Sequence, residues 1–368
     1  MPWFDYAHHD TCMSTATQII VWTSLSLFLL TVLLHLLALK LFPRLGLMDF
    51  PERYGLTRSR IPYPTGIIAA LVFLVFFAIF ESTIALKPWS LQACGLMAGI
   101  AILAIVTFRD DRHPLPSSLR LLTQCVVALV IFLTGTRIYT LTNPLAALTG
   151  LDVLPLHTLQ LPIAALNYPS LLGMLFTVLW LALTMNALNW FDGVRGQVSV
   201  VSVLGFVTIG LLSLSDRVGD FSLGVISFAL AAIALGCLLF DRPGPLALLG
   251  DTGSMFFGLM LGVLTIFTGG KVATGFLVLG VPLIDSGIVI VRRVLKGKSI
   301  FVGDTQSEHL HHRLLRRGWT EWQIIGLTTI LGASFGITAL FLSTLEKFLA
   351  ALALLLIMLL LSIYSGRR

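Results

Sequence analysis

Long apolar runs alternate along this chain with short polar segments that carry most of its charges. Eleven of the runs approach the roughly 20 apolar residues that a membrane-spanning helix needs. They cover residues 18–42, 66–86, 90–108, 120–139, 170–188, 197–214, 221–240, 253–268, 273–291, 323–343 and 347–364. The one long polar segment, near 292–322, is too short for a separate soluble domain. The pattern predicts an all-α polytopic membrane protein with about 11 transmembrane helices and one membrane-embedded domain over residues 1–368.

Composition agrees with this interpretation. Of the 368 residues, 57% are hydrophobic and 11% are charged, against roughly 25% charged in a soluble domain. The four cysteines are scattered, which indicates neither a disulfide framework nor a thiolate metal site. The first apolar run is too long for a signal-peptide core, and no Lys or Arg precedes it. We therefore expect it to be a retained spanning helix.

The positions of Lys and Arg predict the orientation in the membrane. With the amino terminus outside, eighteen Lys and Arg residues fall in the inner loops and the tail. The outer connections hold five, namely Lys87, Arg137, Arg217, Lys271 and Lys347. This bias predicts an outer amino terminus and a cytoplasmic carboxyl terminus. The net charge of +6 then reflects topology and membrane lipids, and it requires no nucleic-acid partner.

Carboxylates also concentrate on the predicted inner face, where topology does not require them. The third apolar run ends in "FRDDRHPLP", which sets Asp110 and Asp111 side by side. In "NALNWFDGVRG", Asn186, Asn189 and Asp192 are three residues apart, so a helix would present them within an arc of about 120°. Hydrogen bonding between helices is the structural alternative for such residues. Their combination with two glycines favours a binding site.

Two further segments add phosphate-binding chemistry. In "LLGDTGSMFFG", glycines surround Asp251 at a helix start, where N–H groups can bind phosphate and the carboxylate can hold a cation. A simple helix cap is the alternative. In "HLHHRLLRRG", His309, His311 and His312 stand beside Arg313. The arginines would repel zinc, so a pyrophosphate is the expected ligand, with a solvated basic loop as the alternative.

Carboxylates for a hard cation and His/Arg donors for phosphate are typical of metal-dependent phosphoryl transfer. From about residue 44 to 318 the sequence resembles the polyprenyl-phosphate N-acetylhexosamine-1-phosphate transferases (glycosyltransferase family 4). The motifs, in order, are "GLMDFPERYGLTRSRIPYPTG", "FRDDR", "NALNWFDGVRG", "LLGDTGSMFFG", "VPLIDSGIVIVRRVLKGKSIFVGD" and "HLHHRLLRRG". The "HLHH" form resembles the WecA-like branch, whereas the peptidoglycan translocase carries "PLHHHFE".

This resemblance implies a bacterial inner-membrane enzyme with its active site on the cytoplasmic face. It would transfer a sugar 1-phosphate from a UDP-N-acetylhexosamine, with UDP-GlcNAc as the first expectation, to undecaprenyl phosphate. The products would be undecaprenyl-diphospho-sugar and UMP. This is the first membrane step of O-antigen, common-antigen or other cell-surface polysaccharide synthesis. The expected cofactor is Mg²⁺, with Mn²⁺ as an alternative. The sequence leaves open whether the protein forms a homodimer.

The resemblance also implies roles for individual residues. The catalytic residues would be Asp110, Asp111, Asp192 and Asp251. The metal ligands would come from Asp111, Asp192 and Asp251. Donor binding would involve Asn186, Asn189, Arg195, His309, His311 and His312. Asp49 and Arg53 match the family's first inner loop, and the chemistry of an anionic acceptor adds Arg112 and Arg120 beside the paired aspartates. These four are the expected acceptor-binding residues.

Elementary chemistry favours direct attack of the lipid phosphate, because a phosphate monoester is largely dianionic near neutral pH and needs no strong base. A two-step route through an aspartyl nucleophile stays open. The sequence departs from the family where Arg195 replaces the second aspartate of Asp-Gly-x-Asp-Gly. Arg195 could stack on a base or pair with phosphate, so GalNAc, FucNAc or QuiNAc donors, or a regulatory member, are alternatives. Outside the family, a secondary transporter or an intramembrane aspartyl protease would also place carboxylates near a membrane.

Overall fold

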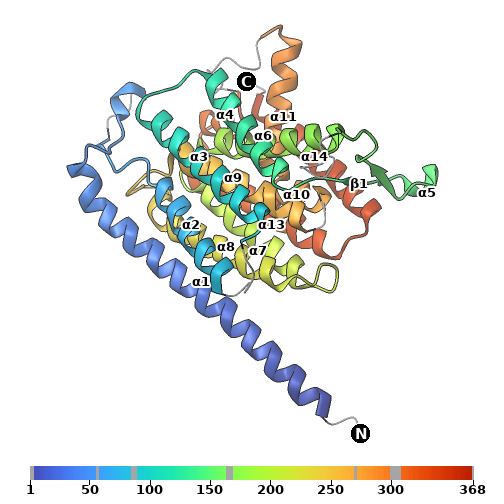
Figure 1. Cartoon of the computed structure of the whole chain (residues 1–368). Coiled ribbons are helices and arrows are strands. Elements are labelled where there is room, and N and C mark those ends of the chain that lie inside the picture. The colour runs from blue at the N-terminus through green and yellow to red at the C-terminus, as the bar shows by residue number, and fades with distance from the viewer. Residues whose placement is uncertain are drawn as a thin grey trace.

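The computed structural model describes residues 4–54, 58–83, 89–162, 169–268, 272–298 and 308–366. Figure 1 shows a bundle of tilted helices. The first half contains α1 (Phe4–Arg44), the 3-10 helix η1 (Pro51–Tyr54), α2 (Gly66–Thr83), α3 (Leu91–Arg112), α4 (Ser117–Leu133), α5 (Ala146–Thr149) and α6 (Leu171–Phe191). The second half contains α7 (Gln197–Leu214), α8 (Phe221–Asp241), α9 (Gly250–Phe267), α10 (Val272–Val278), α11 (Gly280–Leu295), α12 (Leu310–Arg316), α13 (Glu321–Phe341) and α14 (Thr344–Gly366).

Each of the eleven predicted segments contains helix within the described residues, which confirms the all-α polytopic class. Within the described residues, nine helices are long and apolar enough to cross a membrane: α1, α2, α3, α6, α7, α8, α9, α13 and α14. Helix α4 is apolar but has 17 residues. The predicted segment 273–291 is divided into α10 and α11 at Leu279. Pro282 explains this break, because its ring would clash with the carbonyl of Val278 in a continuous helix.

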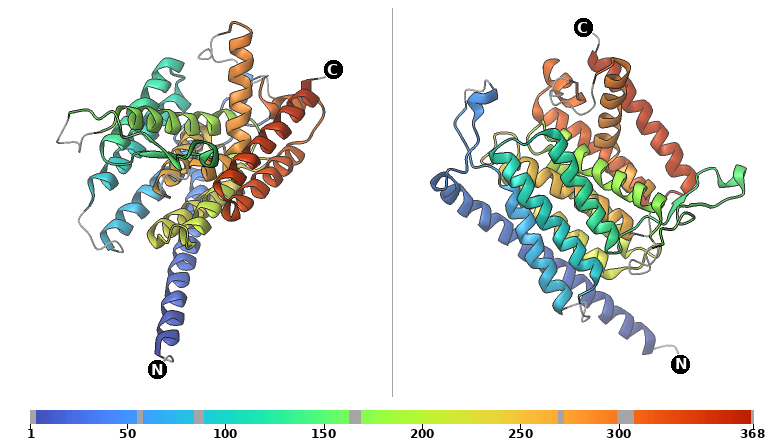
Figure 2. Two further views of the ribbon diagram at one scale, coloured as in Figure 1. Left: turned by 90° about the vertical axis from the view of Figure 1, so that its right-hand side faces the viewer. Right: turned by 45° about the horizontal axis from the view of Figure 1, so that its top comes forward.

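The orientation of the bundle stays a prediction. Lys87 and Lys271, two of the residues counted on the outer side, lie outside the described residues. At the end of the bundle that carries the amino terminus, α1 extends past the other helices, and α11 projects at the opposite end (Figure 2). On one side, β1 (Thr140–Thr142) and β2 (Val153–Pro155) form an antiparallel pair in which Thr140 lies opposite Pro155.

Helix α9 is the central helix of the bundle, with 89% of its residues buried. Glycines allow its backbone to touch its neighbours directly. A Cβ on Gly66 at the start of α2 would lie 2.2 Å from the backbone nitrogen of Gly253 in α9. A Cβ on Gly258 would lie 2.8 Å from the Cα of Met185 in α6. Larger residues at these positions would therefore push α2 and α6 away from the start and middle of α9.

The segment that joins α1 to α2 folds back on itself and is hydrogen-bonded to the segment that precedes α9. Asp49 donates its N–H to the carbonyl of Ile61 at 3.0 Å. Leu248 then donates its N–H to the carbonyl of Pro62 at 3.0 Å, and Thr65 donates its N–H to the carbonyl of Leu248 at 2.8 Å. These bonds fix the first loop against the amino-terminal end of α9, which carries Asp251.

Candidate active site

The paired aspartates at the end of α3 point to different partners. Both oxygens of Asp111 face the first turn of α9. Its Oδ1 accepts hydrogen bonds from the Tyr63 hydroxyl at 2.5 Å and from the Asp251 N–H at 2.9 Å. Its Oδ2 accepts from the Thr252 N–H at 3.0 Å and from the Thr252 hydroxyl at 2.6 Å. Asp111 is therefore a cap for α9, supplied from 140 residues earlier in the chain, and its charge lies at the positive end of the α9 dipole.

Gly250 makes this approach sterically feasible. Its φ of +76° lies in the left-handed region that favours glycine. A Cβ at this position would lie 2.7 Å from the Cβ of Pro64 and 2.9 Å from Oδ2 of Asp111. The glycine before Asp251 is thus required by both the backbone conformation and the contact with Asp111.

Asp110 is buried and points toward α4. Its Oδ1 accepts the N–H of Leu115 at 2.6 Å, which fixes the turn after α3. Its Oδ2 lies 3.4 Å from Nη1 of Arg120, and the same nitrogen lies 3.2 Å from Oδ2 of Asp251. Arg120 therefore joins the carboxylates of α3 and α9 while 34% of its side chain stays exposed.

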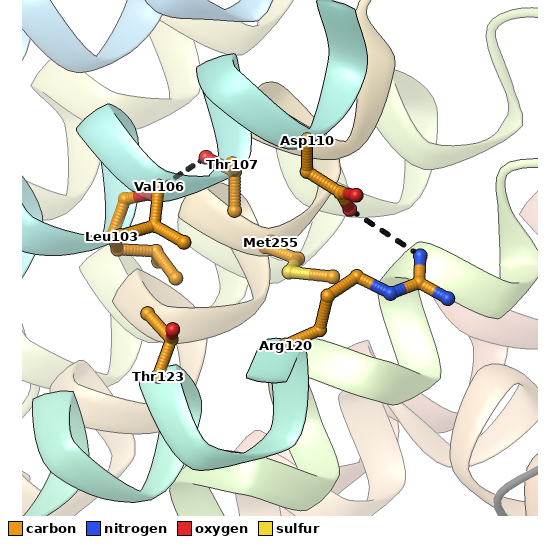
Figure 3. A pocket seen from close by; sticks show the side chains of 7 residues that line it. All are labelled: Leu103, Val106, Thr107, Asp110, Arg120, Thr123 and Met255. Atoms are coloured by element: carbon orange, nitrogen blue, oxygen red, sulfur yellow. Dashed lines mark hydrogen bonds and ion pairs between the residues drawn. The ribbon is translucent and has the colours of Figure 1, made fainter. Parts of the chain in front are cut away.

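A small pocket adjoins this arginine. Figure 3 shows Asp110 and Arg120 on one side of it, and apolar side chains facing them. The remaining lining residues are Leu103, Val106, Thr107, Thr123 and Met255. The pocket thus combines a charged rim with an apolar wall, between α3, α4 and α9.

The predicted polar stripe of α6 is divided between packing and the site. The Asn186 side chain donates to Oε1 of Gln124 in α4 at 2.5 Å and accepts from its Nε2 at 3.2 Å. Asn186 thus holds α4 against α6. The Asn189 side chain donates to the Ser254 hydroxyl in α9 at 3.2 Å. Of these three residues, only Asp192, which directly follows α6, has a buried oxygen (Oδ1) without a hydrogen-bond partner in the described structure.

A second carboxylate, which the sequence analysis did not assign to the site, lies near Asp192. Oδ2 of Asp241, the last residue of α8, accepts the Gly196 N–H at 3.1 Å and the Ser199 hydroxyl at 3.3 Å. Burial raises the pKa of Asp192 well above its usual value, and the charge of Asp241 raises it further. The positive charge of Arg195 opposes that shift. Arg195 therefore lies near these carboxylates. The sequence signal for Asp241 was its position at a predicted inner helix end.

The histidines of the "HLHH" motif lie at the start of α12. Nδ1 of His309 lies 2.7 Å from Oδ2 of Asp285, and the Leu310 N–H donates to Oδ1 of Asp285 at 2.9 Å. Asp285 lies within the quoted motif "VPLIDSGIVIVRRVLKGKSIFVGD", where the sequence analysis assigned it no separate role, and here it fixes α12 to α11. The ring of His311 stacks on that of His309 with 5.7 Å between centroids.

His311 links the histidine motif to the loop after α6. A Cβ on Gly193 would lie 2.0 Å from Nε2 of His311 and 2.9 Å from Nε2 of His312. Both ring nitrogens of His311 are buried without a hydrogen-bond partner among the described residues. Burial lowers the pKa of His311, and burial also lowers the pKa of His312 to about 4. Both rings are therefore neutral near pH 7 and each keeps one N–H donor.

The remaining predicted residues lie around this cluster or apart from it. Asp49 is bonded within the first loop, to Nη2 of Arg58 at 2.5 Å and to the N–H of Ile61 at 2.8 Å. The side chain of Arg112 is exposed at the end of α3 and forms no hydrogen bond or ion pair with the described residues. The side chain of Arg53 lies outside the described structure, as do residues 299–307 before the histidine motif.

The carboxylates can be compared with the needs of a magnesium ion. In the part of the chain that the structure describes, no three His, Cys, Asp or Glu side chains form a ready metal site. Mg²⁺ commonly takes one or two protein carboxylates and completes its shell with water and substrate phosphates. Asp111 already accepts four hydrogen bonds, whereas Asp251 is 31% exposed and Asp192 has an unpartnered oxygen. Asp251 and Asp192 are therefore the two carboxylates here that could hold Mg²⁺, with water or a bound ligand to complete its shell.

Comparison with known proteins places the site in a family context. The model of glycosyl transferase family 4 matches residues 93–269, which include the carboxylates of α3, α6 and α9 but not the histidines. The chain is 29% identical over 329 residues to the undecaprenyl-phosphate alpha-N-acetylglucosaminyl 1-phosphate transferase of Escherichia coli (strain K12), covering 86% of this chain and 82% of the relative.

Two further relatives carry related names. A probable undecaprenyl-phosphate N-acetylglucosaminyl 1-phosphate transferase of Bacillus subtilis (strain 168) is 28% identical over 256 residues, which cover 68% of this chain and 66% of the relative. The phospho-N-acetylmuramoyl-pentapeptide-transferase of Staphylococcus carnosus (strain TM300) is 23% identical over 240 residues, which cover 64% of this chain and 69% of the relative. The chain is therefore similar to transferases whose names contain different sugars, N-acetylglucosamine in two of them and N-acetylmuramic acid in the third.

Proposed function

We propose that this chain, which matches the model of glycosyl transferase family 4 over residues 93–269 and is 29% identical to the Escherichia coli relative, transfers an N-acetylhexosamine 1-phosphate from a UDP-sugar to undecaprenyl phosphate. The products are undecaprenyl-diphospho-sugar and UMP. UDP-GlcNAc is the proposed donor, because the Escherichia coli and Bacillus subtilis relatives are named for N-acetylglucosaminyl 1-phosphate transfer. The product would start a cell-surface polysaccharide such as O-antigen or common antigen.

The position of Arg120 carries this proposal. Its guanidinium lies between Asp110 and Asp251 at the rim of a pocket with an apolar wall. A polyprenyl phosphate has an anionic head on an apolar tail, and it matches that order of charged and apolar surfaces. The phosphate would pair with Arg120, and the first isoprene units would lie along the mouth of the pocket, where Val106 is the partly exposed apolar lining residue.

The donor fits the opposite side of the carboxylate cluster. The neutral rings of His311 and His312 can each give one N–H to the pyrophosphate. Asn189 keeps the end of α6 against α9, and Arg195 lies near Asp192. We assign the pyrophosphate to the side of the carboxylate cluster that carries Gly193 and the histidines, next to Asp251.

The reaction we propose is direct displacement at the β-phosphorus of the donor. An oxygen of the lipid phosphate forms the new P–O bond, the bond from the β-phosphorus to the bridging oxygen breaks, and UMP leaves with that oxygen. Arg120 orients the acceptor, and the histidines orient the donor, which are the contributions of positioning and charge that phosphoryl transfer requires. Mg²⁺, when bound by Asp251 and Asp192, would neutralise the pyrophosphate charge.

We also propose that the site faces the cytoplasm in a bacterial inner membrane. The inner-loop excess of Lys and Arg supports this orientation. The candidate site lies at the same helix ends as those basic loops, since the ends of α3, α6 and α8 and the start of α9 meet there.

The test is release of UMP by the purified chain with undecaprenyl phosphate and Mg²⁺, across a panel of UDP-GlcNAc, UDP-GalNAc, UDP-FucNAc and UDP-QuiNAc. We expect turnover with one of them, and loss of turnover in Asp251→Asn. Asp216→Asn is the matched control, because Asp216 is exposed in a connection at the opposite end of the bundle. Full activity of Asp251→Asn, or no UMP from any donor, would refute the proposal.

A further inference from the structure

Two arginines from different helices converge on one serine near the end of the chain. Nη2 of Arg292, in the last turn of α11, donates to the Ser362 hydroxyl at 2.6 Å. Nη1 of Arg313, in α12, donates to the same hydroxyl at 3.1 Å, and its Nη2 donates to the Ser362 carbonyl at 2.7 Å. A Cβ on Gly366 would lie 2.2 Å from Nη2 of Arg313, so this guanidinium lies directly against the last turn of α14.

This group of side chains has an excess of positive charge. Arg292 and Arg313 are half-buried, and neither forms an ion pair with a carboxylate in the described residues. Burial lowers the pKa of Arg313, and the positive charges of Arg292 and Arg316 lower it further. The negative charge of Asp285 raises the pKa of Arg313, but both Asp285 oxygens are already hydrogen-bonded to His309 and Leu310 at the start of α12.

The end of α14 offsets only part of that charge. Its carbonyls carry a partial negative charge of about half an elementary charge, against two full positive charges. Partly buried charges are normally paired or bound to a counter-ion. The structure thus leaves a binding position for an anion at Arg292, Arg313 and Ser362.

The surroundings indicate where that anion comes from. Apolar side chains next to the arginines are exposed on both helices: Val291 (57%) and Leu295 (81%) on α11, and Leu360 (57%) and Ile363 (51%) on α14. Figure 2 shows α11 and α14 at the edge of the bundle rather than inside it. In a membrane, such side chains contact acyl chains, while the arginines lie near the level of the headgroups.

We propose that Arg292, Arg313 and Ser362 bind the phosphate group of an anionic phospholipid. The lipid would belong to the leaflet nearest the carboxyl-terminal end of α14, which the positions of Lys and Arg predict to be the cytoplasmic one. Guanidinium groups suit a phosphate because they donate two hydrogen bonds in a fixed plane. The lipid would lie between α11 and α14, with its acyl chains on the exposed apolar side chains. Because α12 carries both Arg313 and the histidines, the bound lipid would also stabilise the histidine motif. The inference does not depend on the proposed reaction.

Lipid retention by the full chain tests this site. Nanodiscs of phosphatidylcholine, with or without phosphatidylglycerol, would be followed by native mass spectrometry to count retained phosphatidylglycerol without any substrate. We expect Arg292→Gln and Arg313→Gln each to weaken retention about tenfold, from the loss of a charge-assisted contact. Arg44→Gln is the matched control, because Arg44 is an exposed arginine at the end of α1 on the same side.

A second variant protects the test against misfolding. Ser362→Asp places a carboxylate between the two arginines, so it should fold, lose phosphatidylglycerol retention and no longer gain thermal stability from that lipid. In the last experiment, inorganic phosphate is added to the chain purified in detergent, and its effect on thermal stability is compared with that of phosphatidylglycerol. Stabilisation by phosphate equal to that by the lipid would overturn the lipid assignment, and equal retention in wild type, Arg292→Gln, Arg313→Gln and Ser362→Asp would overturn the site itself.

Discussion

Substitution of Asp111 by Asn separates two roles that activity alone would confuse. The carboxylate accepts four hydrogen bonds, two from backbone N–H groups of Asp251 and Thr252 and two from hydroxyls of Tyr63 and Thr252. An asparagine offers one acceptor oxygen and one NH₂ group. Whichever way the amide turns, one hydroxyl can reverse its hydrogen bond, but one backbone N–H must face the NH₂ group.

The cost follows from these contacts. An unsatisfied buried N–H costs about 1 to 3 kcal/mol, and the three remaining bonds lose their charged acceptor, at roughly 0.5 kcal/mol each. We therefore expect Asp111→Asn to lower the free energy of unfolding by about 3 kcal/mol. Asp251→Asn should lower it by about 1 kcal/mol or less, because its carboxylate is partly exposed and pairs with Arg120.

The assay is unfolding of the purified chain in mixed detergent micelles, followed by tryptophan fluorescence in the absence of Mg²⁺ and substrates. UMP release is measured in parallel, and both variants should lose it. A stability of Asp111→Asn equal to that of wild type, with activity lost, would refute the cap and favour a role for Asp111 as a direct ligand. Equal losses of stability in both variants would show that our assignment of the two carboxylates is wrong.

Three further outcomes are expected. Gly193→Ala places a methyl group 2.0 Å from Nε2 of His311, and displacement of that ring should reduce kcat/KM for the UDP-sugar by about 100-fold; unchanged kcat/KM would exclude His311 from donor binding. Chelation by EDTA should stop UMP release, and Mg²⁺ should restore it better than the larger Ca²⁺. Because the pKa of His312 falls from 6.5 to about 4 in the folded chain, the unfolded state takes up its proton first as pH falls, so stability should decrease between about pH 6.5 and pH 4. His312→Asn should show a smaller decrease over that range in thermal unfolding.

Hydropathy predicted the helices well because a lipid environment imposes length and apolar composition on each segment separately. The exception is the segment 273–291, which was predicted as one helix and is divided before Gly280. Its apolar composition remains continuous through the break, and the signal that predicts it is Pro282, whose effect depends on backbone sterics rather than hydropathy.

The sequence predicted which residues form the site, but only some of the residues they contact. Adjacent aspartates had to diverge on a helix, and Asp110 and Asp111 do so. That Asp111 caps α9 could not be read from the sequence, because the N–H groups it accepts belong to residues 140 positions away. Asp241 and Asp285 were missed for the same reason, since their roles depend on the loop after α6 and on α12.

The burial of α9 divides the molecule into parts that experience the bilayer differently. Protein surrounds this helix along most of its length, so Asp251 belongs to a helix that has little contact with lipids. The histidines stand instead on α12, which is held by α11 and α14 at the edge of the bundle. A change in membrane thickness or fluidity should then leave Asp251 nearly in place and shift the histidines relative to it, so under the proposed assignment it should alter the affinity for the UDP-sugar.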